Sequence, residues 1–372
     1  MRRRLRLAIL IALFTLGLLP HTAAPASAAP ASSGHIVAHE VSLDAPAAQP
    51  AGATALSIGS TGGAIPVEYL SSVVAAGQLF DRLGVHWTER AGVTDPIAFD
   101  VRTSTDGSVW TDWSAITDDD DMFDADRNEH YGAPIPVSGD ARFAQYRASG
   151  NADALLHVGL TFMDVTDLNA GPLARLANDL QNAIAMAGLS YASAAVGPSK
   201  ILTRQDWAAD ESLMKWTPEY KRVQKAIVHH TAGDDGGTNV AATIRAIYYF
   251  HAVTRGWGDI GYNFLVDKYG NIWTGRAGGD HVIGGHAYGW NNGSFGVAAI
   301  GTYSSTTPTP AMVGAIANII AMKFAQFGIA PYGADTYTHQ EQRSDGTWVP
   351  VTSNPPNIQG HRDSNYIVGQ NG

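Results

Sequence analysis

The pattern of apolar and polar positions differs between two regions of the chain. Between residues 67 and 165, short runs rich in β-branched and aromatic residues alternate with turn residues. Thr105-Asp106-Gly107 separates the alternating runs Phe99–Thr103 and Val109–Trp113, which predicts a hairpin that carries Trp110 and Trp113 on one face. Further strands are predicted at Val85–Trp87, Arg142–Arg147 and Leu155–Phe162. Together these runs predict a small all-β, sandwich-like or barrel-like domain over residues 67–165.

From residue 199 to 372 strand and helix patterns alternate, which is typical of an α/β domain. Ala226–Thr231 reads as a buried strand, and Asn239–Val253 as a helix with Thr238 or Asn239 as its N-cap. A second helix opens at Thr309 and Pro310 and closes at Gly328. The other predicted elements are a hairpin of Tyr262–Val266 with Asn271–Thr274, a strand at Phe295–Gly301, and a turn-rich insertion around Ser344–Gly346 and Pro355-Pro356.

Three segments lie outside these two regions. Residues 1–28 carry clustered arginines, an apolar stretch at Leu7–Leu19 and the small residues Ala26-Ser27-Ala28, which predicts a cleaved export signal rather than a retained membrane span. Residues 29–66 are rich in Ala, Pro, Ser and Gly and predict a flexible leader. Residues 166–198 predict a linker that contains an amphipathic helix around Leu173–Met186.

Composition narrows the classes of function. The 372 residues include no Cys, which excludes disulfides, thiolate metal sites and thiol catalysis. The formal net charge of −10 argues against a nucleic-acid partner. An export signal without cysteine fits a secreted bacterial protein, which we expect outside the cell and monomeric.

Two features of the β-rich region allow a functional and a structural interpretation. Asp118–Asp121, with Asp124 and Asp126, could chelate calcium, but the run lacks the Gly and Glu of the usual loop, and a solvated acidic loop is favoured. Trp87, Trp110 and Trp113 could form a sugar-stacking platform, although core positions are favoured.

The candidate chemistry lies in the α/β region. His229 stands at the carboxyl end of an apolar strand, where open α/β sheets place their ligand crevices. His230, its neighbour, must point to the opposite face. His361 follows a glycine in a distant loop. Spacing alone leaves three possibilities for His229 and His361: zinc ligands, a pair of general bases, or unrelated residues.

A set of ordered motifs lies within roughly residues 200–368. They are Ile227-Val228-His229-His230-Thr231, Tyr249-Phe250-His251, Arg255-Gly256-Trp257-Gly258-Asp259-Ile260-Gly261-Tyr262-Asn263-Phe264, Gly270–Arg276, Gly284-Gly285-His286-Ala287, Asn291–Val297 and Gly360-His361-Arg362-Asp363. In order and spacing this set resembles the peptidoglycan recognition protein and type-2 N-acetylmuramoyl-L-alanine amidase family.

The resemblance implies a fold, a ligand and a set of site residues. It implies a mixed central β-sheet flanked by helices, with His229 and His361 as ligands of a zinc ion. Zinc would activate water against the lactyl amide between N-acetylmuramic acid and the L-Ala of a peptidoglycan stem. Tyr262 would be the catalytic residue that hydrogen-bonds the oxyanion or positions the water. The implied substrate-binding residues are Trp257, Arg276, His286 and Asn292.

The chain differs from catalytic members of the family at the position of the third zinc ligand. Catalytic relatives place a Cys eight residues after the second ligand histidine, where this chain has Gly369, and a Thr or Lys six residues after it, where this chain has Ile367. Two hypotheses follow: an amidase lineage whose chain is truncated or frame-shifted and compromised in turnover, or a non-catalytic peptidoglycan-binding protein. We expect the first, with weak or absent activity. A carbohydrate-binding or adhesion protein led by the β-rich region is a third hypothesis.

Overall fold

The computed structural model describes residues 36–44, 69–90, 92, 96–118, 128–165, 201–343 and 346–365. Residues 32–372 form one compact unit. The predicted export signal, the predicted helix at 173–186 and Asp119 to Asp126 of the acidic run lie outside the described residues. So do Ile367 and Gly369.

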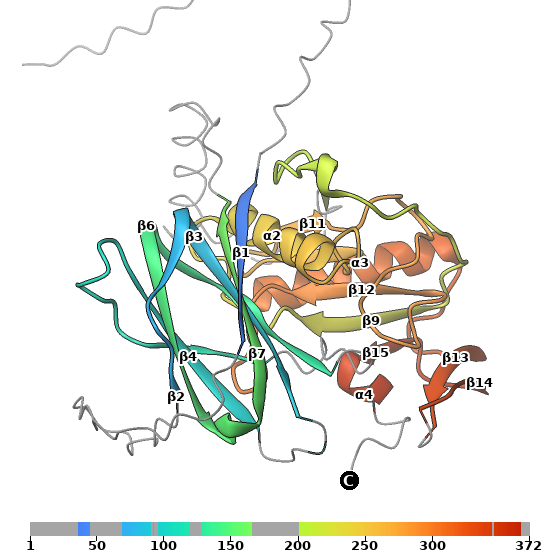
Figure 1. Cartoon of the computed structure of the whole chain (residues 1–372). Coiled ribbons are helices and arrows are strands. Elements are labelled where there is room, and N and C mark those ends of the chain that lie inside the picture. Colours follow the sequence, from blue (N-terminus) through green and yellow to red (C-terminus); the bar gives the residue numbers. More distant parts are fainter. Residues whose placement is uncertain are drawn as a thin grey trace, which may run out of the picture. The chain divides into compact units, whose positions relative to one another are not determined.

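The N-terminal part of the described chain is an antiparallel sheet, here called sheet A (Figure 1). Its seven strands run in the order β1-β7-β3-β6-β4-β5, with β2 paired to β6. The strands are β1 Val37–Asp44, β2 Tyr69–Leu70, β3 Val74–Glu89, β4 Ile97–Ser104, β5 Ser114–Ile116, β6 Glu129–Gly150 and β7 Leu155–Asp164, with a short 3-10 helix, η2 Ala152–Ala154, before β7. The predicted all-β class of this part is confirmed.

One strand of sheet A falls in the segment predicted to be a flexible leader. β1 pairs with β7 over its whole length, from Val37 opposite Asp164 to Asp44 opposite His157. The expectation of a leader without structure is therefore wrong for Val37–Asp44. The composition of the segment indicated a flexible chain, but a strand that pairs with a distant strand needs little apolar surface of its own.

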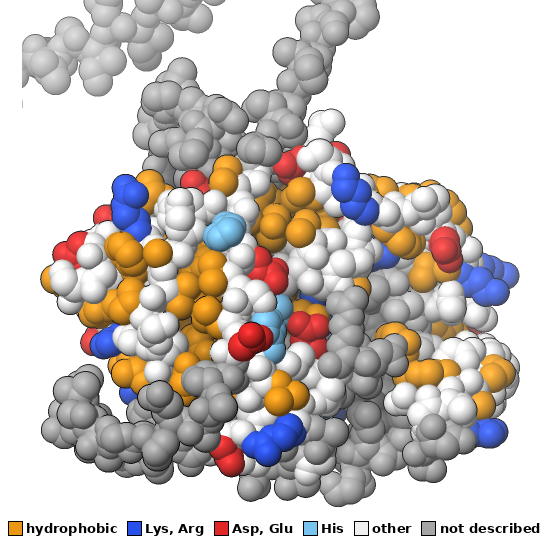
Figure 2. All heavy atoms as spheres, viewed as in Figure 1, with side chains coloured by type: hydrophobic (Ala, Val, Ile, Leu, Met, Phe, Trp, Pro, Cys, Tyr) orange, Lys and Arg blue, Asp and Glu red, His pale blue; other side chains and the backbone are white. Residues whose placement is uncertain are grey.

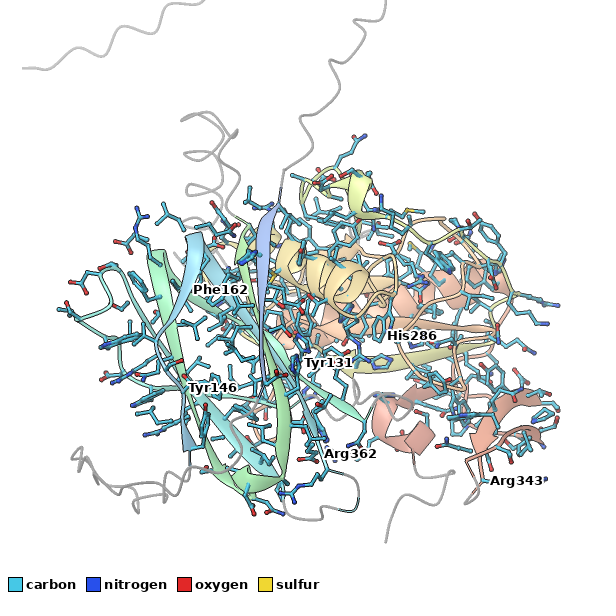
Figure 3. All side chains as sticks on the ribbon, in the orientation of Figure 1. Tyr131, Tyr146, Phe162, His286, Arg343 and Arg362 are labelled. Atoms are coloured by element: carbon cyan, nitrogen blue, oxygen red, sulfur yellow. The ribbon has the colours of Figure 1, made fainter. Side chains whose placement is uncertain are left out.

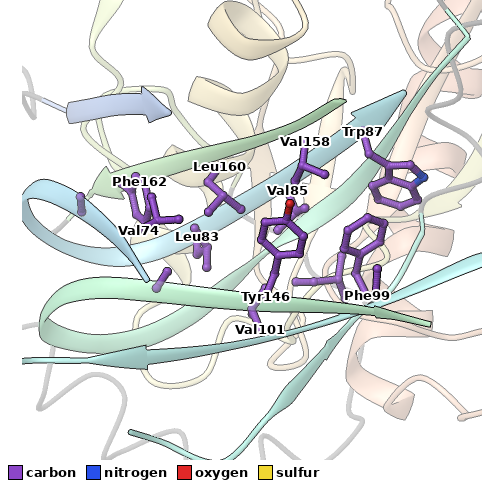
Figure 4. Close-up of a cluster of buried hydrophobic side chains, with 14 of the residues drawn as sticks. Val74, Leu83, Val85, Trp87, Phe99, Val101, Tyr146, Val158, Leu160 and Phe162 are labelled. Atoms are coloured by element: carbon purple, nitrogen blue, oxygen red, sulfur yellow. The ribbon is translucent and has the colours of Figure 1, made fainter. Parts of the chain in front are cut away.

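Alternating side chains of β3, β4, β6 and β7 form the core of sheet A (Figure 4). Trp87 is buried there against Phe99, with ring centroids 4.6 Å apart. Trp110 and Trp113 are only half-buried, and the Arg102 guanidinium lies over both rings at 4.9 and 4.5 Å. A core position is thus confirmed for Trp87 and wrong for the other two, which flank a cation on the outer side of the sheet.

The C-terminal part is built on a mixed sheet, sheet B, with strand order β15-β9-β12-β10-β11-β8. The neighbours β10 and β11 are antiparallel, and all other pairs are parallel. Its strands are β8 Ile201–Leu202, β9 Lys225–His230, β10 Phe264–Val266, β11 Ile272–Thr274, β12 Ser294–Ala299 and β15 Ile358–Gly360. The helical elements are η3 Glu211–Leu213, α2 Val240–Tyr249, the π-helix η4 Phe250–Thr254, α3 Pro310–Phe327 and α4 His361–Asn365.

Helices α2 and α3 cover opposite faces of sheet B (Figure 1). On β12, Ala298 belongs to the cluster that contains α2, whereas Phe295 and Val297 belong to the cluster that contains α3. Strand side chains alternate between faces, so each layer receives every second residue. The predicted α/β class with a mixed sheet and flanking helices is confirmed. Helix α3 has the length and composition of a membrane span, yet it buries one face, including Phe324, on sheet B.

The helix boundaries follow from local capping. The Asn239 side chain accepts a hydrogen bond from the Ala242 amide at 3.1 Å, and the Thr309 hydroxyl accepts one from the Met312 amide at 3.2 Å. Gly328 ends α3 in the left-handed conformation, with φ 71°. All three predicted caps are confirmed. The insertion predicted only as turn-rich forms a hairpin of β13 Tyr337–Gln342 and β14 Trp348–Ser353.

Sheets A and B share buried side chains. Met163 and Val165, at the end of β7, lie in the same apolar cluster as Trp207 and Ile244. The buried Arg245 of α2 donates from Nε to the Val165 carbonyl at 2.8 Å. The boundaries of two separate domains therefore stay a prediction, because buried residues from both parts of the chain pack in one apolar cluster.

An imidazole and two carboxylates lie together on sheet A. Nδ1 of His86 is 2.7 Å from Glu129 Oε1, and Nε2 is 3.5 Å from Glu40 Oε1. Burial disfavours the charged imidazole, but the hydrogen bonds with Glu129 and Glu40 outweigh burial and raise the pKa of His86 to about 9. Histidine and acidic side chains gather near the middle of the face in Figure 2.

This raised pKa predicts a loss of stability at alkaline pH. The folded state holds the His86 proton more tightly than the unfolded chain, so the stabilisation is complete below about pH 6.5 and disappears as the pH rises to about 9. At most about 3 kcal/mol is lost over this window. Thermal unfolding of the wild type should show a fall in Tm between these pH values that His86→Gln lacks. Parallel curves for the two proteins would contradict the prediction.

Candidate functional site

The two histidines predicted to converge do so at one edge of sheet B. His229 lies at the carboxyl end of β9, and His361 begins α4 directly after β15. β15 runs parallel to β9, with Gly360 opposite Val228, and this register brings the two histidines side by side. Their ring centroids are 4.5 Å apart, and the residues are 4% and 8% exposed. His230 points to the other face, where its Nδ1 accepts a hydrogen bond from the Tyr303 amide.

His286 lies against His229, with its Nδ1 2.9 Å from His229 Nε2. Burial, together with His229, His361 and Arg276, lowers the pKa of His286 far below its usual value, so this ring is neutral. The Ser294 hydroxyl donates to the Trp290 carbonyl at 2.6 Å and lies 3.4 Å from His286 Nε2.

The contact with His286 engages Nε2 of His229. Nδ1 is therefore the nitrogen by which His229 would hold a metal ion. Such a partner orients a ligand histidine and fixes its tautomer. His286, which is predicted to bind substrate, is buried and contacts His229, and its role in binding stays a prediction.

Among the described residues, His229 and His361 are the two imidazoles that would hold a metal, and they do not complete a catalytic zinc site. Catalytic zinc takes three protein ligands. Among the described residues, no group of three or more His, Cys, Asp or Glu is arranged to hold a metal ion. The Asp363 carboxylate, two residues after His361, accepts a hydrogen bond from the Gly360 amide at 2.9 Å. This set does not fit a three-ligand zinc centre.

Tyr262 lies beside His229, as the predicted catalytic role requires. Their ring centroids are 5.5 Å apart, and the phenol donates to the His230 carbonyl at 3.4 Å. On its other side the Tyr262 ring contacts His251, whose Nδ1 accepts from the Gly261 amide. Burial, with Arg255 and Arg276, lowers the pKa of His251 far below its usual value. The phenol is therefore held between two imidazoles, of which His251 is neutral.

The remaining predicted groove residues differ in exposure. Trp257 is half-buried and contacts His251, with ring centroids 4.8 Å apart. Arg276 is buried, with its guanidinium 3.8 Å from the Trp216 ring centroid and Nη1 donating to the Ile260 carbonyl. Burial lowers the pKa of Arg276 to about 10. Asn292 is exposed on the loop before β12.

Two residues that shape this site, Asn291 and Trp216, were not predicted to belong to it. The Asn291 side chain accepts from the amides of His286 and Ala287, both at 2.9 Å, and so fixes the loop that carries His286. Trp216, which covers Arg276, precedes the motifs altogether. The asparagine pair before β12 was a usable signal for Asn291, whereas no local pattern marks Trp216.

Comparison with known proteins gives the family. The family model described as Amidase_2, N-acetylmuramoyl-L-alanine amidase, matches residues 219–369. Peptidoglycan-recognition protein SC2 of Drosophila melanogaster is 34% identical over 140 residues, which are 37% of this chain and 74% of that protein. The chain belongs to this family of peptidoglycan recognition proteins and type-2 amidases.

Other relatives cover different shares of the chain. Human N-acetylmuramoyl-L-alanine amidase is 45% identical over 74 residues, 20% of this chain and 12% of that protein. The solved structure of wild-type Drosophila PGRP-LB is 28% identical, covers 44% of this chain and 83% of that chain, and has a TM-score of 0.34. The segment matched by the family model contains His229, Tyr262, His286 and His361, but none of the strands of sheet A.

Proposed function

We propose that the protein binds peptidoglycan at the edge of sheet B where His229 and His361 meet, and that it hydrolyses the substrate weakly or not at all. The observation that carries the proposal is this pair of histidines, with Tyr262 beside them, in a chain of the peptidoglycan recognition family. The ligand would be the N-acetylmuramic acid and stem peptide of a muropeptide.

The side chains around the histidines suit such a ligand. Trp257 offers a partly exposed ring for a sugar or an aliphatic stem residue. Arg276 is buried against Trp216 and remains charged at neutral pH, which favours carbonyl or carboxylate groups of the stem. Neutral His251 and His286 add no charge to the site.

The proposal also concerns hydrolysis of the bound peptidoglycan. In an amidase of this family the bond cleaved would be the lactyl amide between N-acetylmuramic acid and L-Ala, with zinc as the Lewis acid. Here His229 and His361 are the only ligands that the described residues offer, and position 369 carries a glycine without a ligating side chain. Binding with little turnover is therefore the function that the geometry favours. The export signal pattern supports secretion to the cell wall.

Pull-down on insoluble sacculi tests binding directly. We expect the full chain to sediment with purified peptidoglycan, and Trp257→Ala to raise the apparent Kd for sacculi about tenfold, since a stacked aromatic ring contributes up to about 1.5 kcal/mol. Trp87→Phe, a change in the core of sheet A, is the matched control and should bind as the wild type does. Equal sedimentation of Trp257→Ala and the wild type would contradict the proposed groove.

A further inference from the structure

Arg255 lies between two aromatic rings that come from different parts of the chain. Its guanidinium carbon is 4.0 Å from the ring centroid of Tyr131 on β6 and 4.3 Å from that of Trp257. Tyr131 is 1% exposed and Arg255 is buried. A planar guanidinium stacks on aromatic faces, and this attraction strengthens when water is excluded. The contact joins sheet A to a residue of the proposed groove.

Tyr131 is itself fixed by sheet A. Its hydroxyl donates to Glu129 Oε2 at 2.6 Å, and the other oxygen of Glu129 lies 2.7 Å from His86 Nδ1. The His86 ring stacks on Tyr131, with centroids 5.5 Å apart and an interplanar angle of 13°. All three residues are on β3 or β6, outside the segment that the family model matches.

Two glycines allow aromatic and histidine rings to lie directly against the backbone of sheet A. A Cβ on Gly84 would lie 2.8 Å from a ring carbon of Phe250. Phe250 in turn packs edge-on against Tyr131, with centroids 5.8 Å apart. A Cβ on Gly159, the strand neighbour of His86, would overlap the His86 ring. Only glycine permits both close approaches.

From Arg255 the contacts continue into the site. Trp257 contacts His251, His251 contacts Tyr262, and Tyr262 contacts His229, with ring centroids 4.8, 5.5 and 5.5 Å apart. Figure 3 shows Tyr131 at the side of sheet A that faces α2, with His286 marking the site beyond. Each ring in this series contacts the next one.

We propose that Tyr131 is a positioning residue for muropeptide binding: sheet A holds Arg255, and through Arg255 the Trp257 ring, in the orientation that the ligand needs. This inference rests on the proposed function of the groove. It means that sheet A is part of the binding unit, and that the family-matched segment alone lacks one support of its groove.

The test uses the full chain with three substitutions. Tyr131→Leu removes the ring over Arg255, Tyr131→Phe keeps the ring and loses the hydroxyl, and Tyr146→Leu is the matched control. Tyr146 lies on the same strand and is also 1% exposed, but it packs in the core of sheet A against Phe99 (Figure 4). Titration calorimetry with a soluble N-acetylmuramoyl tetrapeptide gives Kd, and thermal unfolding gives Tm.

We expect Tyr131→Leu to raise Kd about tenfold and Tyr131→Phe less than about threefold, since the ring carries the stacking. Tyr146→Leu should lower Tm and leave Kd unchanged. An unchanged Kd for Tyr131→Leu, or equal changes for Tyr131→Leu and Tyr146→Leu, would overturn the proposal.

A second readout separates this inference from the proposed function. The indole N–H resonance of Trp257, assigned with Trp257→Phe, should move in Tyr131→Leu and stay in place in Tyr146→Leu without any ligand. If the wild type binds no muropeptide, the proposed function fails and this resonance alone decides the positioning role. If Tyr131→Leu does not fold, both readouts are taken on Arg255→Lys, which keeps the charge and loses the planar guanidinium between the two rings, and an unchanged Kd with an unmoved resonance would overturn the proposal.

Discussion

Replacing Gly369 by Cys should raise the rate of lactyl-amide hydrolysis in the presence of zinc by about 100-fold or more over the wild type. By the family pattern, a thiolate at position 369 would join the imidazoles of His229 and His361, whose rings already lie 4.5 Å apart. Three protein ligands leave zinc one open position for water or substrate. Lewis-acid polarisation of the amide then contributes several kcal/mol, which corresponds to a rate factor of about 100 or more. Release of N-terminal alanine from sacculi measures the rate.

Gly369→Ser is the matched control for this gain. It places a hydroxyl where the first variant places a thiol, and a neutral hydroxyl is a poor zinc ligand compared with a thiolate. We expect Gly369→Ser to hydrolyse at the wild-type level. If Gly369→Cys gained no more activity than Gly369→Ser, a missing ligand would not be the reason for weak turnover.

In the Gly369→Cys background, Tyr262→Phe should lower the hydrolysis rate about 100-fold while changing muropeptide Kd less than about threefold. Loss of one oxyanion donor costs a factor of about 10²–10³ in rate. The phenyl ring keeps the packing of Tyr262 between His229 and His251, so only the hydroxyl is removed. Kinetics on a soluble muropeptide, with kcat and KM resolved, give the measurement.

Tyr248→Phe is the control for removal of a buried hydroxyl. The Tyr248 phenol on α2 donates to the Asp210 carbonyl at 3.1 Å, and its ring packs edge-on against Trp207. This variant should lower Tm and leave kcat unchanged. A kcat for Tyr262→Phe within about twofold of its parent would show that the phenol does not serve the transition state.

Local signals predicted those parts of the fold that local chemistry determines. The caps at Asn239 and Thr309 and the terminal Gly328 depend on side chains within a few residues of the backbone groups that they satisfy. β1 could not be predicted in this way, since its stability comes from pairing with β7 more than 100 residues later. The hairpin β13–β14 was hidden for a similar reason: its turn residues were visible, but the pairing of Tyr337 with Ser353 was not.

The candidate site shows the same division. The motifs identified His229, Tyr262 and His361, and the parallel pairing of β15 with β9 explains why the histidines meet. The contact of His286 with His229 and the stacking of Tyr131 on Arg255 are contacts through space between residues far apart in the chain. A single sequence carries no pattern for such contacts, because any buried aromatic or histidine residue satisfies the same local rules.

Binding to peptidoglycan and hydrolysis of it can be measured for the wild type in one sample. Purified sacculi are incubated with the protein, once with added zinc and once with a chelator, and the bound fraction and new N-terminal alanine are measured together. The structure predicts that the protein sediments with the sacculi in both conditions and releases, with zinc, about 1% or less of the alanine that Gly369→Cys releases. Chelator-sensitive release by the wild type at the rate of Gly369→Cys would contradict the account.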